Sequence, residues 1–304
     1  MKDVMPAILS VVLSYAISTF GLNMYLEKAG TSTSNSKEKV VAVKKKTETP
    51  IKKKKVEIAK KTPTKTPSKI EKNISVDSKD IQKSYENWNT YNKENIDLMS
   101  SFTAIDDSGK KVGKELFLNL LRTGLYIPIK TDKPYNYQLV EINADADSKI
   151  KKTIRSAAKI AVKYHNMEGK KLPEYDFVDI NGVSYNKKDT EGKLLVLKCW
   201  FITCKICVEE FPELNALVDR YKDENVEFVS LAFDKGDKLT EFLKTKPFKY
   251  SVIPEQKDYM NKKLKVKQYP THVIVDTDGT ILKMTNNVRS LTHELDKITG
   301  KNNS

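Results

Sequence analysis

The sequence contains very little cysteine, and the few cysteines it has lie close together. Of 304 residues only three are cysteine, namely Cys199, Cys204 and Cys207, and all three fall within nine residues. A disulfide framework that staples distant parts of a chain is therefore excluded, because such a framework needs cysteines spread along the sequence. Cysteines this scarce and this clustered indicate chemistry rather than scaffolding.

The chain is also poor in groups that could complete a metal site. A C-x-x-C pair such as Cys204 and Cys207 is half of a zinc site, and zinc would need two more ligands. Cys199 falls on a predicted strand, and the three histidines are far apart in the sequence. We therefore expect no metal, and no cofactor beyond a redox-active Cys204–Cys207 disulfide.

Aromatic residues are absent from the segment that carries most of the net charge of +14. Residues 36–73 contain fourteen lysines and four glutamates, which gives that segment a net charge of +10. A nucleic-acid surface would place basic residues on a folded face with interleaved aromatics. We interpret residues 31–77 as a disordered Lys-rich linker and expect no nucleic-acid partner.

One stretch near the N-terminus lacks charge altogether. The 23 residues Val4–Leu26 are long enough to cross a hydrocarbon core of about 30 Å as a helix. We predict that residues 1–30 are a membrane anchor. A cleaved signal segment is the alternative, since Ala16–Ser18 offers a weak cleavage site. Lysines flank this stretch, but they do not determine on which side of the membrane the C-terminal part lies, because long domains translocate largely regardless of charge.

Residues 78–165 have the pattern of a small α+β accessory module. We find no catalytic constellation in it, and we expect His165, at the end of its last helix, to be solvated. Periodicity predicts helices at 84–99, 115–122 and 147–165 and strands at 101–105, 126–130 and 135–142.

Residues 166–304 alternate between strands and helices, which predicts an α/β fold. The nearly continuous apolar run Leu194–Phe201 is typical of a central buried strand. An amphipathic helix follows the cysteine pair. Further strands are predicted at 175–179, 183–185, 225–233, 271–276 and 280–284, and further helices at 238–244, 257–264 and 290–298.

The position of the cysteine pair has a chemical consequence. A C-x-x-C at a strand-to-helix junction puts Cys204 at a helix N-terminus, where unpaired backbone N–H groups and the helix dipole favour a thiolate. Lys205 adds a nearby positive charge. We predict that Cys204 is the nucleophile and that Cys207, one turn into the helix, resolves the mixed disulfide.

A second feature lies immediately before a predicted strand, at Tyr269-Pro270-Thr271. A proline at the start of a strand usually marks only the boundary of that strand. Together with an upstream C-x-x-C, it predicts a cis peptide bond between Tyr269 and Pro270 that faces the cysteines. The preceding backbone would then be free to pair with an extended peptide substrate.

These motifs resemble the TlpA-like branch of thioredoxin-fold thiol–disulfide oxidoreductases, which belongs with the redoxin and AhpC/TSA families. The resemblance covers residues 172–298 approximately and implies a thioredoxin-like three-layer fold at the C-terminus. The Lys-rich composition is similar to that of AT-rich bacteria of the Bacteroidetes type. The matching features are the Pro173…Phe177 opening, the Glu191-Gly192-Lys193 turn, Trp200, the cysteine pair, Glu209-Glu210-Phe211-Pro212, Tyr269-Pro270-Thr271 and the Asp276…Gly279 hairpin.

The resemblance also implies a location and partners. Similar proteins are single-pass proteins of the bacterial cytoplasmic membrane with the C-terminal domain in the periplasm. They reduce disulfide-bearing protein substrates and take electrons from a membrane electron donor of the DsbD/CcdA type. Their glutamate three residues after the second cysteine assists proton transfer, and Glu210 occupies that position here. A solvated acid in the first helical turn is the alternative for Glu210. Trp200, with Tyr269-Pro270-Thr271, is expected at the substrate groove.

Three positions depart from the family pattern. The cysteines enclose Lys205-Ile206 without the usual proline, Thr203 replaces a common tryptophan, and Lys198 stands where an aspartate or asparagine is usual. Lys198 and Lys205 are candidates for redox tuning. Lys198 could pair with Glu210 or lower the thiol pKa, or it could extend outward to solvent. Cys199 is expected to pack as a small buried residue.

Two other functions are compatible with these motifs. A peroxiredoxin-like thiol peroxidase would share the fold, but such enzymes usually place a threonine three residues before the reactive cysteine, where this chain has Phe201. A non-enzymatic tether, in which the cysteine pair only senses redox state, is the other alternative. The leading prediction is a membrane-tethered disulfide reductase.

Overall fold

The computed structural model describes residues 77–301. The predicted anchor at 1–30 and almost all of the predicted linker at 31–77 lie outside the described residues. Among the helices of the described part, none is long and apolar enough to cross a membrane. Residues 77–301 all belong to one compact unit.

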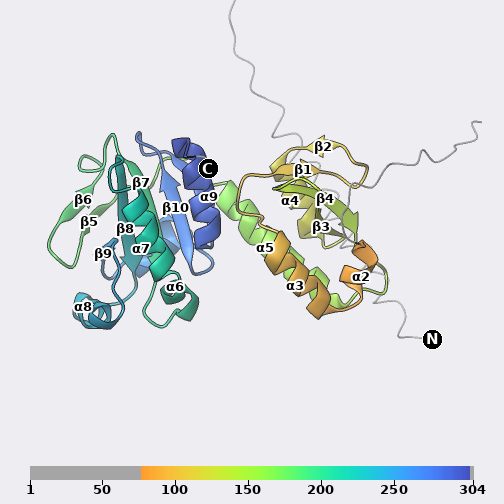
Figure 1. Ribbon diagram of the computed structural model, residues 1–304, viewed down its shortest axis with the longest axis horizontal. Helices are drawn as coiled ribbons and strands as arrows, with labels where there is room; N and C mark the ends of the chain where they lie inside the picture. The colour runs from red at the N-terminus through yellow and green to blue at the C-terminus, as the bar shows by residue number, and fades with distance from the viewer. Residues whose placement is uncertain (1–76, 302–304) are drawn as a thin grey trace, which may run out of the picture. The chain divides into compact units, whose positions relative to one another are not determined.

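The first half of the described chain forms a four-stranded sheet in the order β2-β1-β4-β3, accompanied by helices (Figure 1). Helices α4 and α5 pack on each other, and their apolar faces, which include Phe117, Leu121, Ile150 and Ile154, are buried. The elements are α2 (Ser78–Gln82), α3 (Tyr85–Asn95), β1 (Thr103–Ile105), β2 (Lys111–Val112), α4 (Lys114–Thr123), β3 (Tyr126–Lys130), β4 (Asn136–Glu141) and α5 (Ser148–His165).

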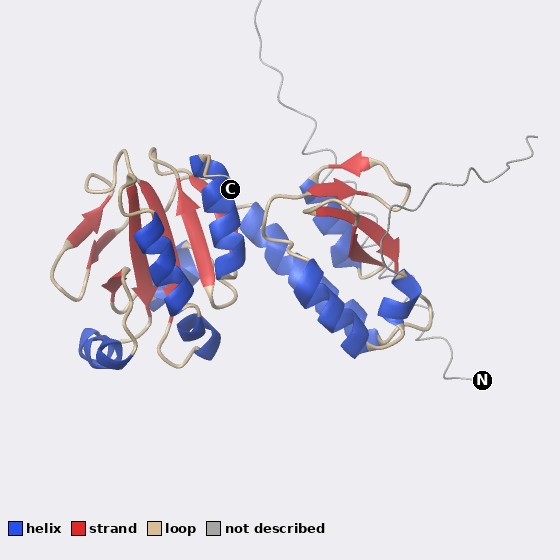
Figure 2. Ribbon diagram, in the orientation of Figure 1, coloured by secondary structure: helices blue, strands red, loops and turns tan. Residues whose placement is uncertain are grey.

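The second half is built on a five-stranded sheet in the order β11-β10-β7-β8-β9 (Figure 2). Strand β7 lies at its centre, parallel to β8 and antiparallel to β10, and all seven of its residues are buried. The elements are β5 (Asp176–Val178), β6 (Ser184–Asn186), β7 (Leu194–Trp200), α6 (Lys205–Glu209), α7 (Phe211–Arg220), β8 (Val226–Ala232), α8 (Gly236–Thr245), β9 (Ser251–Ile253), β10 (Thr271–Val275), β11 (Ile281–Thr285) and α9 (Val288–Thr299).

Helical segments cover both faces of the five-stranded sheet. Val196 and Ile274 belong to a core cluster with residues of α7 and α9, such as Leu214 and Leu291. The neighbouring strand residue Leu197 belongs to a different cluster, together with Met260, Leu264 and Tyr164. Because side chains alternate between the faces of a strand, the sheet lies between two helical layers. This is the expected thioredoxin-like α/β fold.

Three local features differ from the sequence-based expectation. The helix after the cysteines is divided at Glu210, which ends α6 and precedes α7, with Pro212 in the first turn of α7. Proline lacks an N–H and favours the start of a helix, which accounts for the division. Residues 259–263 form a π-helical turn instead of an ordinary helix, and the short edge strands β2 and β9 were not predicted.

Helix α9 contacts the segment that follows α3. The hydroxyl of Ser290 donates to the carboxylate of Asp97. One turn further along α9, Glu294 Oε2 accepts from the hydroxyl of Ser101 at 2.9 Å, and Asp97 and Glu294 are both buried. Charge-assisted hydrogen bonds of this kind are stronger than neutral ones. They hold the segment 97–101 against the C-terminal helix.

Candidate active site

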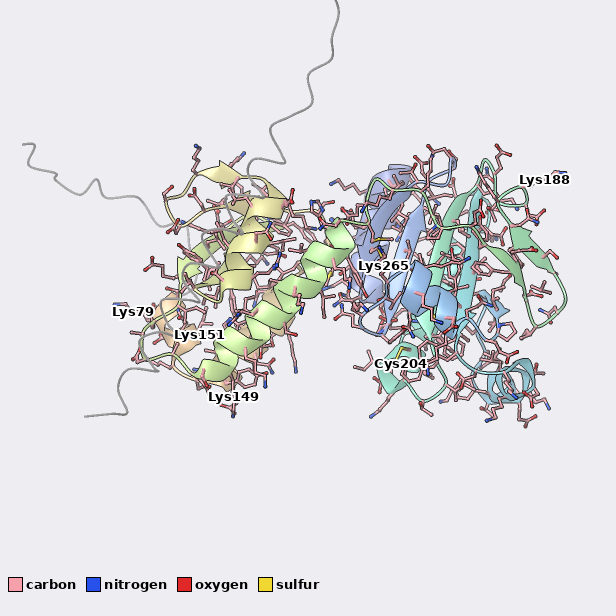
Figure 3. All side chains as sticks on the ribbon, turned by 180° about the vertical axis from the view of Figure 1, so that it is seen from behind. Lys79, Lys149, Lys151, Lys188, Cys204 and Lys265 are labelled. Atoms are coloured by element: carbon pink, nitrogen blue, oxygen red, sulfur yellow. A yellow bond between two sulfur atoms is a disulfide. The ribbon has the colours of Figure 1, made fainter. Side chains whose placement is uncertain are left out.

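The two motif cysteines form a disulfide where the central strand meets the following helix. Cys204 caps the N-terminus of α6 and is bonded to Cys207 one turn later. Figure 3 shows Cys204 on α6, beside one end of the five-stranded sheet. Cys204 is 8% exposed and Cys207 is 0% exposed. Cys204 is therefore the sulfur that an outside thiol can reach, in agreement with its predicted role as nucleophile.

The predicted cis peptide bond is present between Tyr269 and Pro270, immediately before β10. The expectation that Trp200 and Thr271 line a substrate groove is wrong for their side chains, because both are 0% exposed. Trp200 points to the same face as Lys198, two residues earlier on β7, and packs edge-on against Phe211 of α7. Tyr269 is the member of the predicted groove that is partly exposed, and Pro270 is buried.

Three partly exposed aromatic side chains cluster at the strand ends beside the cis proline. Phe201 stacks on Phe233 with ring centroids 5.0 Å apart, and Tyr269 meets both rings edge-on at 5.5 and 5.0 Å. Edge-to-face and offset stacking are favourable ring arrangements. The cluster presents a rigid apolar surface next to the site.

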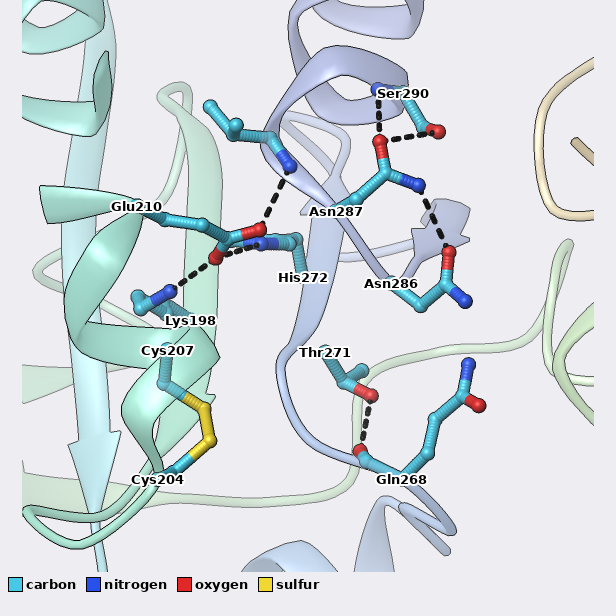
Figure 4. Close-up of polar contacts among 11 residues, drawn as sticks. Lys198, Cys204, Cys207, Glu210, Gln268, Thr271, His272, Asn286, Asn287 and Ser290 are labelled. Atoms are coloured by element: carbon cyan, nitrogen blue, oxygen red, sulfur yellow. Dashed lines mark hydrogen bonds and ion pairs between the residues drawn. A yellow bond between two sulfur atoms is a disulfide. The ribbon is translucent and has the colours of Figure 1, made fainter. Parts of the chain in front are cut away.

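A buried carboxylate connects the cysteine-bearing helix to the sheet (Figure 4). Glu210 Oε2 lies 2.6 Å from Lys198 Nζ and 3.1 Å from His272 Nε2. Its other oxygen, Oε1, accepts the backbone N–H of Val288 at the start of α9, at 2.9 Å. Lys198 and His272 are 0% exposed and Glu210 is 7% exposed. Because Glu210 follows Cys207 by three residues, both side chains lie on one side of this helical segment.

The charges of this cluster shift one another's protonation. Burial alone would raise the pKa of Glu210, but His272 and Lys198 outweigh burial and hold it at about 2. Burial lowers the pKa of the Lys198 ammonium, against the attraction of Glu210. Burial and the positive charge of Lys198 lower the pKa of His272. Glu210 is therefore ionised at neutral pH, and it compensates the buried lysine.

Lys198 and Lys205 lie in opposite environments, one buried and one exposed. Lys198 pairs with Glu210, so the alternative that it extends to solvent is wrong, as is the alternative of a solvated Glu210. The side chain of Lys205 is 88% exposed and lies 3.6 Å from Glu209. It is a surface pair, and such pairs contribute little.

His272 was missed by the sequence reasoning, which considered it only as a metal ligand. The available signal was its place in the apolar strand Thr271–Val275, where a polar side chain needs a partner. Its pairing opposite Lys198 depends on the strand register, which only the folded chain reveals.

Cys199 lies on the opposite face of β7 and is fully buried, as expected. Burial raises the pKa of its thiol to about 12, so it stays protonated and unreactive. The hydroxyl of Tyr164, at the end of α5, lies on the same side of the sheet and contacts Thr271 at 2.8 Å. The third cysteine is thus separate from the redox pair.

Comparisons with known proteins found a matching family, related sequences and solved structures. Residues 168–284 match the AhpC/TSA family. The thiol-disulfide oxidoreductase ResA of Bacillus thuringiensis subsp. konkukian is 32% identical over 116 residues, which span 38% of this chain and 67% of that protein. The thioredoxin-like protein YneN of Bacillus subtilis is 27% identical over 118 residues, or 38% of this chain and 68% of that protein. A solved structure titled as a putative thiol:disulfide interchange protein DsbE from Chlorobium tepidum is 23% identical, with a TM-score of 0.40, and covers 43% of this chain and 96% of its own.

An accessible sulfur bonded to a buried one, at the end of a thioredoxin-like sheet, defines a thiol–disulfide oxidoreductase. The likeness to ResA extends over two thirds of that relative. The chain belongs to the TlpA-like thioredoxin-fold thiol–disulfide oxidoreductases.

Proposed function

We propose that this protein reduces disulfides of partner proteins on the outer side of the bacterial cytoplasmic membrane, to which it is tethered. The observation that carries the proposal is the unequal burial of the bonded cysteines, 8% exposed for Cys204 and 0% for Cys207. A partner can form a mixed disulfide with Cys204, while Cys207 remains available inside the protein to release it.

The exchange takes place in two steps. The Cys204 thiolate attacks a partner disulfide, so that one S–S bond forms to Cys204 and the partner's bond breaks. The Cys207 sulfur then attacks Cys204, restores the internal disulfide and releases the partner as a dithiol. A membrane electron donor of the DsbD/CcdA type would return two electrons to the pair. Glu210, three residues after Cys207, would assist proton transfer in the second step.

The charge balance beneath the cysteines supports a reducing direction. A buried cation without a partner would stabilise the Cys204 thiolate and make the disulfide a stronger oxidant. Here Glu210 lies 2.6 Å from Lys198 and neutralises it. Lys198 thus adds no uncompensated positive charge that would favour oxidation of partners.

Two features support a location near the membrane. The first is the predicted anchor within residues 1–30. The second is helix α5, which contains no acidic residue and whose basic side chains are suited to anionic lipid headgroups. Its basic residues are Lys149, Lys151, Lys152, Arg155, Lys159 and Lys163.

Trapping of partners in the native host tests the proposal. The Cys207→Ser variant should accumulate mixed disulfides through Cys204 in membrane fractions, and Cys204→Ser should accumulate none. Acid quenching followed by thiol alkylation should find the wild-type pair mostly reduced in the cell. A pair found mostly oxidised in the presence of its donor would contradict the reducing direction, and absence of trapped partners would contradict the proposed exchange.

The two other functions considered for this chain are not favoured. A peroxidase would need a different environment three residues before Cys204, where Phe201 stacks on Phe233. The relatives found for this chain include several named thiol-disulfide oxidoreductase. The same relatives favour an enzyme over a tether that only senses redox state.

A further inference from the structure

A row of four polar residues crosses the five-stranded sheet on the side of Glu210. Lys198 of β7 pairs directly with Ser230 of β8 and with His272 of β10, and His272 pairs with Thr285 of β11. Residues directly opposite one another point to the same face of a sheet. Three of the four are 0% exposed, and Thr285 is 1% exposed. We call this set the polar row.

Several atoms of the polar row have no hydrogen-bond partner among the described residues. They are Ser230 Oγ, His272 Nδ1 and Thr285 Oγ1. Buried polar atoms are nearly always paired, and an unpaired one needs a reason. Lys198 Nζ and His272 Nε2, in contrast, both contact Glu210.

The hydrogen bond to Glu210 fixes the tautomer of His272. An ionised carboxylate can only accept, so Nε2 of His272 carries the proton that points to Glu210 Oε2. Nδ1 of the neutral ring is then an unprotonated, enclosed nitrogen. A proton can be added to Nδ1 without breaking a hydrogen bond of the Lys198–Glu210–His272 cluster.

We propose that His272 is the redox-linked proton site of this protein, gaining a proton at Nδ1 when the Cys204–Cys207 disulfide is reduced and losing it when the disulfide re-forms. The physical cause is charge. Reduction creates a thiolate on Cys204, and negative charge added in a poorly solvated region favours a cation nearby. His272 is a positioning residue that compensates this charge. The proposal rests on thiol–disulfide exchange at the pair and does not depend on the direction of electron flow or on the membrane.

The balance of the step is complete. A donor dithiol loses two electrons and two protons and becomes a disulfide, while the Cys204–Cys207 bond breaks. Cys207 Sγ takes one proton, His272 Nδ1 takes the other, and Cys204 remains a thiolate. When a partner disulfide re-oxidises the pair, its two sulfurs receive the electron pair, and the protons leave Cys207 and His272.

Every element around His272 contributes to its environment. Strand β7 contributes Lys198, and the α6–α7 junction contributes Glu210. Burial and the charge of the same Glu210 raise the pKa of Tyr250, in the segment before β9. Strand β11 offers the hydroxyl of Thr285, and α9 offers the Val288 N–H, which binds Glu210. Among the groups around His272, the one whose charge is set directly by the redox state is the cysteine pair.

Nitrogen NMR of the three imidazoles tests the proposal on the wild-type protein. We expect the pKa of His272 to be higher by about one unit or more in the protein reduced with excess dithiothreitol than in the oxidised protein. His165, which contacts Glu168 near the end of α5, is the internal control, and reduction should leave its nitrogen signals unchanged. A His272 titration that is the same in both states would overturn the proposal.

The reduction potential supplies a second readout. In glutathione buffers between about pH 5 and pH 8, the number of protons taken up per two electrons should fall by up to one in His272→Gln, whose amide keeps a donor for Glu210. His165→Gln is the matched control and should behave as wild type. An unchanged proton count in His272→Gln would refute the inference. If that variant does not fold, the wild-type NMR titration decides alone, and neither measurement involves a partner protein.

Discussion

The hydroxyl of Tyr164 lies 2.8 Å from the hydroxyl of Thr271 and connects the end of α5 to the first residue of β10. Thr271 Oγ1 donates to the carbonyl of Gln268 at 2.8 Å, and the backbone N–H of Lys267 donates to the Tyr164 oxygen at 3.1 Å. Tyr164 must therefore donate to Thr271. This chain of hydrogen bonds fixes residues 267–271, the segment that contains the cis proline.

Removal of the Tyr164 hydroxyl should loosen this segment. We expect Tyr164→Phe to lower the free energy of unfolding by about 1–3 kcal/mol, because the Lys267 N–H loses its buried partner. Urea denaturation measures the loss, and amide exchange should show faster opening at Lys267. Tyr126→Phe, at a partly exposed site on β3, is the control. Equal stability of wild type and Tyr164→Phe would contradict the assignment.

The three cysteines should differ in reactivity. In the reduced protein we expect iodoacetamide to modify Cys204 at least about tenfold faster than Cys207, because Cys204 is the more exposed and caps a helix. Cys199 should remain unmodified until the protein unfolds, since it is buried and its pKa is raised to about 12. Mass spectrometry of timed samples measures all three sites. Fast labelling of Cys199 in the folded protein would show that this side of β7 opens.

Removal of one partner of the Lys198–Glu210 ion pair should destabilise the protein strongly. Lys198→Met leaves Glu210 buried with one cationic neighbour fewer, and we expect the free energy of unfolding to fall by about 3 kcal/mol. The double variant Lys198→Met/Glu210→Gln should recover part of this loss, because it removes the unpaired charge. The pKa of His272 should also rise in Lys198→Met, since Lys198 lowers it. Additive losses in the double variant would exclude coupling between the two residues.

The stability of the protein should depend on pH through Glu210. Its pKa is about 2 in the folded protein, against 4.5 for an ordinary glutamate. A lowered carboxyl pKa stabilises the fold above the unfolded value, and this contribution is lost as the pH falls from about 4.5 to about 2. The difference in unfolding free energy between wild type and Glu210→Gln should therefore change by about 3 kcal/mol across that range. A difference that stays constant with pH would mean that Glu210 is not held ionised.

Much of the fold could be predicted from the sequence, because the signals were local. The apolar run Leu194–Phe201 corresponds to β7, and the periodicity of 147–165 corresponds to α5, within one residue at their ends. The short edge strand Ser251–Ile253 could not be predicted, because three residues carry no period.

The parts of the site that depend on sequence motifs could be predicted, and the parts that depend on how the strands pair could not. The cysteines and the cis bond at Pro270 followed from their order along the chain. The contact of His272 with Glu210 joins residues 62 positions apart and follows from the register of β10 on β7. The burial of Trp200 was predictable from its place in the apolar run Leu194–Phe201, because a central strand of this kind is buried on both faces.

Helix α9 gives the redox site a dependence on residues far upstream. Its first N–H, at Val288, binds Glu210, and its Ser290 and Glu294 bind Asp97 and Ser101. A fragment cut to the family-matching residues 168–284 would lack α9 entirely, and one that starts at Lys170 would lack Asp97, Ser101 and Tyr164. Potentials and exchange rates measured on such fragments would describe a different electrostatic environment from that of the whole protein.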